Sequence, residues 1–258
     1  MLDFTRKARY GFDDLVRLVA LLRAPGGCPW DGVQTHQSIR RNFLEEAYEA
    51  CEGFDRDDAA LMREELGDVL LQVVFHADIE RAAGRFTVDD VCDGVCNKLI
   101  FRHPALFSDE EAPDWETLKR REKGQKTTSE AMDGVAKSLP ALWRAEKLRK
   151  KAGELPGTES DEARLGKLEE EVSALRRTFS GDGDVEQALG GVLFAAVCAG
   201  MNRKADPERA LHRACDDFIR RFSRIERAAA ERGLPPEELP QEELLRLWAD
   251  EGTTQCGE

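Results

Sequence analysis

The chain has 258 residues, enough for one large domain or two small ones, each with a core of its own. It carries 51 Asp and Glu against 38 Lys and Arg, and its formal net charge of −13 argues against nucleic acid as a partner. A small phosphorylated ligand remains compatible with this charge, because a metal ion can bridge two sets of negative groups.

The sequence also argues against export and membrane insertion. Arg17 and Arg23 interrupt the apolar stretch at residues 15–22, so no secretory signal is recognised. The longest uncharged run, around residues 188–201, is shorter than the ~20 residues that a membrane span needs. Seven scattered cysteines without a Cys-x-x-Cys pair favour reduced thiols. We therefore expect a cytoplasmic protein with no membrane segment.

Helical periodicity dominates the chain, which predicts an all-α fold. The run VLLQVVF (69–75) resembles a buried strand, but it lies inside a helix-length segment, so helix is favoured. Residues 109–165 are charged and irregular and predict a connector with one or two helices, including LPALWRAEKLRKKAG. The expected helices of the N-terminal part are 12–24, about 38–54, about 59–83, and one from Thr87 to Pro104.

The chain repeats itself. KLEEEVSALRRTF (167–179) aligns with NFLEEAYEACEGF (42–54), and ALGGVLFAAVCAG (188–200) aligns with ELGDVLLQVVFHA (65–77). This predicts two tandem helical modules related by duplication. Their expected limits are 1–108 for the first module, 109–165 for the connector, 166–250 for the second module and 251–258 for a frayed tail.

The acidic residues of the first module form two pairs. Glu46 and Glu49 share one helical face, as do Glu65 and Asp68, because a spacing of three brings side chains together. In an antiparallel hairpin that turns near residues 55–58, the two pairs lie within about 3 Å of the same height. Four anions so close together need a counterion, and oxygen-only ligands favour Mg²⁺ or Mn²⁺ over zinc.

These segments resemble a known family. CPWDGVQTHQSIRRNFLEEAYEA, REELGDVLLQVVFHA and NKLIFRHPALF are similar to the N-terminal half of MazG-type nucleoside triphosphate pyrophosphohydrolases. The resemblance implies four-helix modules that assemble as homodimers, and Mg²⁺-dependent hydrolysis of nucleoside triphosphates to monophosphate and pyrophosphate. It implies metal ligands at Glu46, Glu49, Glu65 and Asp68, with Glu45 as the acid that orients or deprotonates the attacking water.

Candidate substrate contacts are less sharply defined. Lys98 and Arg102, four residues apart, present two charges on one helical face, and the resemblance favours a role in phosphate binding over a role at the helix end. Asn97 is a possible companion. Trp30, Gln34 and His36 are candidates for contact with the base or sugar. We expect His76 to be a satisfied core or interface histidine.

The second module departs from the family pattern. The third acid of Glu-Glu-x-x-Glu is Ala174, and Ala188 and Gly191 replace the two acids of the other helix. We therefore expect residues 166–250 to be catalytically inactive. Two alternatives stay open: a non-enzymatic helical interaction module, and a pyrophosphatase restricted to dUTP or a modified nucleotide. A ferritin-like di-iron protein is disfavoured, because no histidine follows a glutamate at the Glu-x-x-His spacing.

Overall fold

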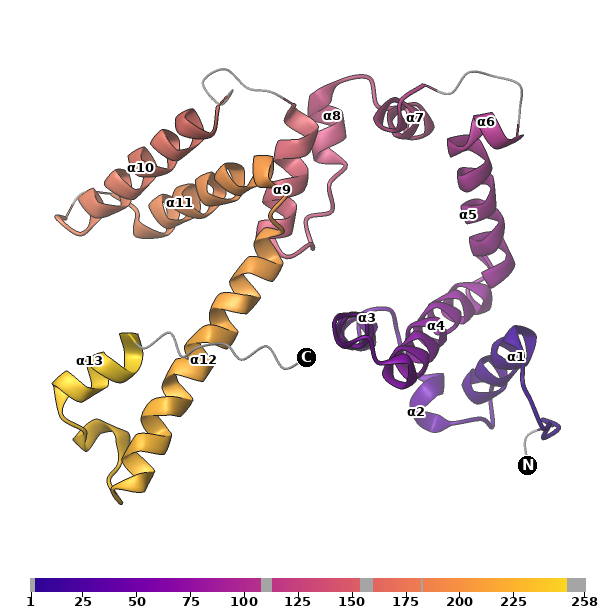
Figure 1. The fold of residues 1–258 in the computed structure, drawn as a ribbon. Helices are drawn as coiled ribbons and strands as arrows, with labels where there is room; N and C mark the ends of the chain where they lie inside the picture. The colour runs from indigo at the N-terminus through magenta and orange to yellow at the C-terminus, as the bar shows by residue number, and fades with distance from the viewer. Residues whose placement is uncertain (1–2, 108–112, 154–159, 182, 250–258) are drawn as a thin grey trace. The chain divides into compact units, whose positions relative to one another are not determined.

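The computed structural model describes residues 3–107, 113–153, 160–181 and 183–249, and every regular element within these ranges is a helix. This confirms the all-α prediction. The chain forms two compact units, residues 1–122 and 123–258. The helices of the first unit are α1 (Phe12–Arg23), α2 (Pro29–Gly32), α3 (Arg40–Arg56), α4 (Ala59–Ala82), α5 (Val88–Arg102), α6 (Pro104–Phe107) and α7 (Trp115–Glu122) (Figure 1).

The core of the first unit is formed by residues of α1 and α4 and by Ile39, which directly precedes α3. Val19, Ile39, Val74 and Phe75 are each at most 7% exposed and contact one another. A buried ion pair joins α1 to α4, with Arg23 Nε donating to Asp78 Oδ2 at 2.9 Å. The same arginine donates to the Asp31 carbonyl oxygen at 2.7 Å, which fixes the short helix α2.

The α3–α4 hairpin is closed by two aspartates and one glycine. Asp57 takes a left-handed conformation (φ 51°) where α3 ends, and the Asp58 side chain accepts hydrogen bonds from two main-chain N–H groups at the start of α4. A Cβ on Gly53 would lie 3.1 Å from the Met62 nitrogen, so the two helices pack closely because this residue has no side chain. Residues 69–75 lie within α4, which confirms the helical prediction.

The remaining part of the first unit is organised around α5. Thr87 and Asp90 cap its start with reciprocal hydrogen bonds. At its other end Arg102 pairs with Glu122, which ties α5 to α7. Residues 115–122, predicted as connector, thus belong to the first compact unit.

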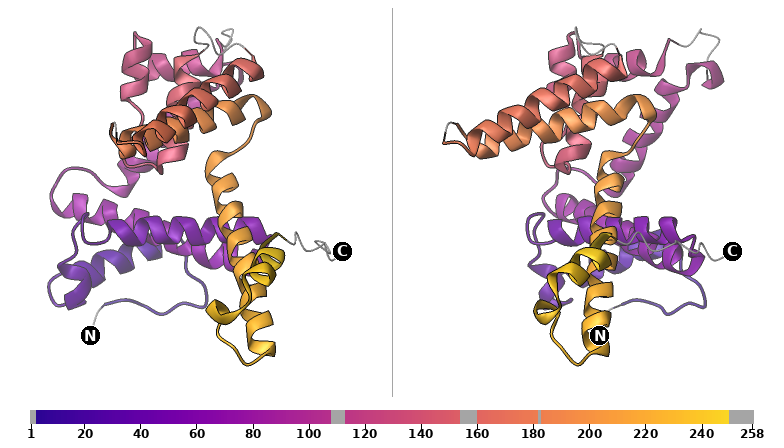
Figure 2. Two further views of the ribbon diagram at one scale, coloured as in Figure 1. Left: turned by 90° about the vertical axis from the view of Figure 1, so that its left-hand side faces the viewer. Right: turned by 60° about the vertical axis from the view of Figure 1, so that its left-hand side comes forward.

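The second unit contains α8 (Thr128–Asp133), α9 (Ala141–Ala152), α10 (Asp161–Thr178), α11 (Val185–Gly200), α12 (Pro207–Glu231) and α13 (Gln241–Ala249) (Figure 2). The helices α10 and α11 form a second hairpin, and α13 packs on α12 around Ile225, Ala229 and Leu239. The expectation of one or two helices in residues 109–165 was too low, since α7, α8 and α9 all lie there. The predicted tail, 251–258, lies outside the described residues.

Two further sequence expectations bear on the chemistry of the chain. Among the described residues, no helix is both long enough and apolar enough to cross a membrane. The six cysteines in the described part of the chain are free thiols, in agreement with the reading of these residues as reduced.

Candidate functional site

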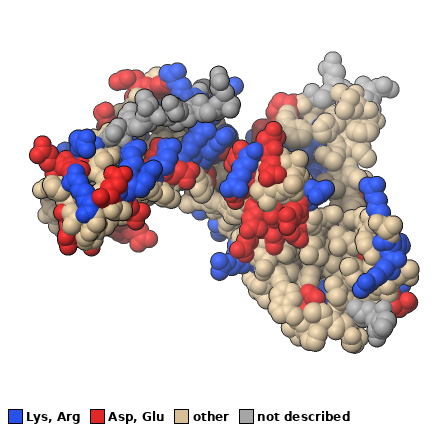
Figure 3. Space-filling model, turned by 60° about the horizontal axis from the view of Figure 1, so that its bottom comes forward, with Lys and Arg blue, Asp and Glu red and all other residues tan. Residues whose placement is uncertain are grey.

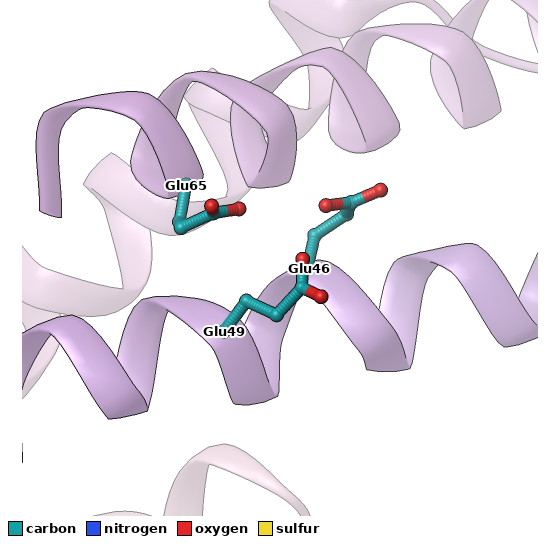
Figure 4. Close-up of side chains that lie close together, drawn as sticks. All are labelled: Glu46, Glu49 and Glu65. Carbon is teal, nitrogen blue, oxygen red and sulfur yellow. The ribbon is translucent and has the colours of Figure 1, made fainter. Parts of the chain in front are cut away.

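The hairpin of α3 and α4 brings three acidic side chains together. Glu46 and Glu49 lie one turn apart on α3, and Glu65 faces them from α4 (Figure 4). A carboxylate oxygen of each residue lies within 4.8 Å of a carboxylate oxygen of each of the other two. We call these three residues the carboxylate cluster. Its oxygen atoms are spaced so that a single cation can contact all of them.

The carboxylate cluster holds negative charge without a basic partner. In the part of the chain that the structure describes, no Lys or Arg forms an ion pair with Glu46, Glu49 or Glu65. Burial is the main cause that raises the pKa of Glu46, followed by the negative charges of Asp68 and Glu49. Asp and Glu side chains also gather into a continuous patch on the surface shown in Figure 3.

The electrostatics of Glu65 are similar. The residue is 9% exposed, and loss of hydration raises its pKa above the ordinary value of 4.5. The charges of Glu49 and Asp68 raise this pKa further. A bound proton or a bound cation would relieve the repulsion at this position. At neutral pH, where carboxyl groups normally ionise, the arrangement favours a cation.

Two other predicted acids border the cluster. Asp68 follows Glu65 by three residues on the same face of α4 and is half-buried. It lies near enough to raise the pKa of both Glu46 and Glu65, although it is outside the group of three converging oxygens. Glu45 is exposed on α3, and its charge contributes to the raised pKa of Glu46.

The predicted phosphate contacts lie on α5, and two of them, Arg102 and Asn97, are engaged by other side chains. Arg102 Nε donates to Glu122 Oε2 at 2.6 Å, and its guanidinium carbon lies 5.5 Å from the centre of the Trp115 ring. Asn97 donates its amide to Asp93 Oδ2 at 2.9 Å. Lys98 is half-buried. The helix α5 packs on α4, α6 and α7, so the structure does not bring these three residues into the carboxylate cluster.

Trp30 and Gln34 belong to one hydrogen-bonded segment before α3. Trp30 lies on α2 and is 59% exposed. Gln34 Nε2 donates to the Trp30 carbonyl oxygen at 2.9 Å, and Ser38 Oγ donates to Gln34 Oε1 at 2.6 Å. Both groups of the Gln34 amide are therefore engaged in holding the segment, while the Trp30 ring stays accessible to a ligand.

His36 belongs to a partly buried polar group, centred on the buried Glu80, that the sequence did not reveal. Its Nε2 bonds to the Glu80 carboxylate, which also accepts a hydrogen bond from Arg85 Nη2 at 2.7 Å. The hydrogen bonds from Arg85 and from His36 lower the pKa of Glu80 to about 2. His36 Nδ1 lies 2.7 Å from His76 Nδ1, so one of the two rings donates a hydrogen bond to the other.

These contacts confirm His76 as a satisfied histidine. Its pKa is lowered by burial first and by the neighbouring His36 second, which keeps the ring neutral. The interaction fixes the segment before α3 against α4. His36 and Glu80 are 44 residues apart, and no local sequence pattern signals such a contact. The proximity of Glu80 and Arg85 across the turn at Gly84 is the one part of the group that the sequence could have suggested.

The hairpin of α10 and α11 corresponds in sequence to the α3–α4 hairpin, which carries the carboxylate cluster. Ala174, Ala188 and Gly191 take the positions that correspond to Glu49, Glu65 and Asp68. These small residues line an open hollow of about 790 Å³, and a Cβ on Gly191 would collide with the Glu171 carboxylate. Of the four positions that correspond to the predicted metal ligands, only Glu171 is an acid in this hairpin, and its carboxylate lies against Gly191.

Comparison with known proteins points to one family. The model of the MazG nucleotide pyrophosphohydrolase domain matches residues 34–107, which include α3, α4 and α5. The chain is 39% identical over 241 residues to the nucleoside triphosphate pyrophosphohydrolase/pyrophosphatase MazG of Thermotoga maritima, covering 92% of this chain and 94% of that one. It is 36% identical over 252 residues to the nucleoside triphosphate pyrophosphohydrolase of Escherichia coli K12, covering 92% and 95%. The similarly named protein of Mycolicibacterium smegmatis is 43% identical over 143 residues, covering 52% and 44%.

Proposed function

The chain belongs to the MazG family, and from this premise we propose that it hydrolyses nucleoside triphosphates to nucleoside monophosphate and pyrophosphate at the carboxylate cluster of the first unit. The observation that carries the proposal is the convergence of Glu46, Glu49 and Glu65 without a basic partner. The names of the relatives favour an enzyme over a non-enzymatic interaction module.

The residues of the cluster fit Mg²⁺, with Mn²⁺ as a substitute. All the converging donors are carboxylate oxygens, the ligands of hard cations, and neither nitrogen nor sulfur takes part. The pKa values of Glu46 and Glu65 are raised by burial and by neighbouring charge, as expected where an ion would offset repulsion. When bound, such an ion supplies charge neutralisation for the triphosphate and makes water easier to deprotonate.

We propose a separate role in the reaction for each of the acidic residues at the site. Water attacks the α-phosphorus, the bond from this phosphorus to the oxygen bridging to the β-phosphorus breaks, and pyrophosphate leaves. We assign Glu45, exposed beside the cluster, as the acceptor of the proton released by the water. We assign Glu46, Glu49, Glu65 and Asp68 as ligands that position the charged groups, which is the main requirement of phosphoryl chemistry.

Lys98, Arg102 and Asn97, which the structure does not bring into the carboxylate cluster, stay the candidate contacts of the remaining phosphate oxygens. Arg102 would exchange its ion pair with Glu122 for the phosphates. The guanidinium favours this exchange because it binds phosphate oxygens with two parallel hydrogen bonds. Lys98 contributes a second positive charge from one turn away on the same face of α5.

The products of the reaction test this function directly. The full chain is incubated with each common ribonucleoside and deoxynucleoside triphosphate in the presence of Mg²⁺, and the products are separated by chromatography. Monophosphate together with pyrophosphate is the expected result. Diphosphate together with orthophosphate would overturn it. The same series of substrates shows whether activity is confined to dUTP, the narrower alternative.

We further propose that the second hairpin takes no part in catalysis. Glu46→Gln is expected to remove most of the activity, whereas the corresponding change Glu171→Gln should leave kcat within about twofold of the parent. The reason is that Ala174, Ala188 and Gly191 offer no ligand atoms beside Glu171. Steady-state kinetics of both variants provide the comparison. A large loss of activity in Glu171→Gln would show that this hairpin contributes to the reaction.

We also propose that the chain forms a homodimer through the first unit. The helix α4 is apolar on several sides, and only part of its surface is covered by α1 and α3. Further exposed apolar residues lie on α3 and α5, and so many on one unit are unusual for a monomer. The residues, each between 39% and 55% exposed, are Leu44, Tyr48, Leu66, Leu70, Leu99, Ile100 and Phe101.

A charge on this apolar surface tests the dimer. Phe101 is 46% exposed, and Phe101→Asp is expected to shift the molecular mass measured by light scattering from that of a dimer toward that of a monomer. Loss of apolar burial and a buried unpaired charge would both oppose association. The control is Phe179→Asp on the second unit, where the side chain is 78% exposed. A parent chain with the mass of a monomer would refute the proposal.

A further inference from the structure

Two acidic residues of α4 are buried outside the carboxylate cluster. Asp78 is 6% exposed and pairs with Arg23, which holds α1 against α4. Glu80 is 7% exposed and makes its contacts on a different side of the helix, with Arg85 and with His36. Buried carboxylates are tolerated only where they are paired, so the partner shows what each of them holds in place. The role of Glu80 therefore depends on what His36 is attached to.

The Glu80 carboxylate is immobilised at the end of α4. Arg85 donates hydrogen bonds to both of its oxygens, and the bond from Nη2 to Oε1 measures 2.7 Å. The main-chain N–H of Arg85 also donates to the Glu80 carbonyl oxygen at 3.0 Å, across the turn at Gly84, whose φ is 69°. Hydrogen bonds between charged groups are among the strongest in proteins. Glu80 thus offers His36 an acceptor with a fixed position.

His36 lies in a tight turn that leads directly into α3. The main-chain N–H of Thr35 donates to Ser38 Oγ at 2.9 Å, and the main-chain N–H of Ser38 donates to Thr35 Oγ1 at 3.2 Å. These reciprocal bonds make the turn and the start of α3 one unit. Both ring nitrogens of His36 are engaged, one by Glu80 and the other by His76. The ring therefore ties the start of α3 to α4.

His76 extends this contact along α3. Its ring stacks on the ring of His36, with centroids 5.0 Å apart and planes at 12°. On another side it meets the Phe43 ring edge-on, at 5.7 Å and 64°. Phe43 precedes Glu46 by three residues and shares its face of α3. The His76 ring thus supports the part of α3 from which Glu46 reaches the carboxylate cluster.

The carboxylate cluster lies between two points at which the α3–α4 hairpin is held. One is the turn at residues 57–58, and the other is the polar group of Glu80, His36 and His76. The separation of the helices between these points sets the distances across the cluster, whose members face one another from α3 and α4 (Figure 4). Mg²⁺ demands nearly ideal geometry and tolerates little error in these distances. Loss of the second point would let α3 tilt about the turn.

The second hairpin keeps a contact at the corresponding positions but lacks its extension. Continuing the alignment of the two hairpins, Asp161 corresponds to His36 and Arg203 to Glu80. These two residues form an ion pair at 2.9 Å. The ring that joins the contact to the acid-bearing helix has no counterpart, because Ala199 takes its position. Its absence from the hairpin that lacks three of the acids is expected if the ring serves the acids.

We propose that Glu80 is a positioning residue for the carboxylate cluster, which acts through His36 and His76 to hold α3 at the distance from α4 that the cation requires. The inference rests on the proposed function, because the cation at the cluster is the one assigned to the reaction there. His36 accordingly affects the substrate only through α3, in place of the direct contact with base or sugar considered from the sequence. Neither Glu80 nor His36 touches the reacting atoms.

The affinity for Mg²⁺ in the absence of nucleotide tests this role, measured on the full chain by isothermal titration calorimetry. Glu80→Gln keeps the size of the side chain and removes its charge, and it is expected to weaken Mg²⁺ binding about three- to tenfold, a typical coupling between groups that share contacts. His36→Leu should have a similar effect. His36→Gln should retain most of the parent affinity, because its amide N–H can still donate to Glu80.

Asp78→Asn is the matched control. It breaks a buried ion pair of the same helix, but the partner lies on α1 and not before α3. It is expected to lower the melting temperature while leaving the Mg²⁺ affinity within about twofold of the parent. A role of Glu80 in overall stability alone would give the same pattern for Glu80→Gln, and that result would overturn the inference.

The two His36 variants decide the question if Glu80→Gln does not fold. Equal Mg²⁺ affinity of His36→Leu and His36→Gln would show that the bond to Glu80 does not position the cluster. A parent chain that binds no Mg²⁺ would refute both the proposed metal site and this inference. A parent chain that binds Mg²⁺ but releases no pyrophosphate from any nucleotide would refute the proposed function, and the affinities of the variants would still decide the role of Glu80.

Discussion

Glu65→Gln is expected to lower kcat by roughly a hundred- to a thousandfold, the range seen when one group that stabilises the charge of a transition state is removed. Glu65 is the member of the carboxylate cluster contributed by α4, and it is 9% exposed. The amide of glutamine keeps the shape of the side chain but lacks the negative charge that a cation needs. Asp68→Asn, one turn further along α4, is expected to have an effect of the same order. Both are measured as pyrophosphate release under saturating substrate.

The thermal stability of the same variant distinguishes loss of function from loss of fold. The pKa of Glu65 in the folded chain is raised above 4.5 by burial and by Glu49 and Asp68, so ionisation of this group destabilises the metal-free protein above that pKa. Glu65→Gln should therefore melt at the same temperature as the metal-free parent or at a higher one. Glu64→Gln, an exposed neighbour, is the matched control and should retain activity. Full turnover by Glu65→Gln would remove the basis for the metal site.

The architecture of this site was predictable because its determinants are local. The spacing of three between Glu46 and Glu49 fixes a shared face, and the lengths from both acid pairs to the turn fix their relative height. Both quantities follow from helix geometry once the turn is located. The acidic turn itself, at residues 55–58, is evident from composition. In the structure three of the four predicted ligands converge, and Asp68 lies beside them.

Contacts between distant segments were not predictable in this way. The ion pair of Arg102 with Glu122 depends on where α7 packs against α5, and no periodicity encodes that position. The bond between His36 and Glu80 depends on the path of an irregular segment. In each case the neighbouring residues in the sequence give no signal. Only the tertiary packing decides whether the side chain has a hydrogen-bond partner.

Removal of the metal is the second large effect, and its dependence on pH follows from the same pKa shifts. A chelator that removes divalent cations is expected to abolish turnover, and Mg²⁺ at about 100 times its dissociation constant should stabilise the fold by about 2.7 kcal/mol. Scanning calorimetry would detect this as a rise in melting temperature of about 5 °C or more for a domain of this size. Glu46→Gln should abolish most of the rise, whereas Glu171→Gln should leave it intact.

The sign of the pH effect is fixed by the direction of the shifts. The pKa values of Glu46 and Glu65 are raised in the folded state, so these groups stabilise the metal-free protein fully below 4.5, their pKa when unfolded, and lose that contribution as pH rises through the folded pKa. Mg²⁺ binds the ionised form and competes with the proton. The rise in melting temperature caused by Mg²⁺ should therefore be larger near pH 8 than near pH 5. An equal rise at both pH values would show that the cation binds elsewhere, because only carboxylates with raised pKa values release protons to it across this interval.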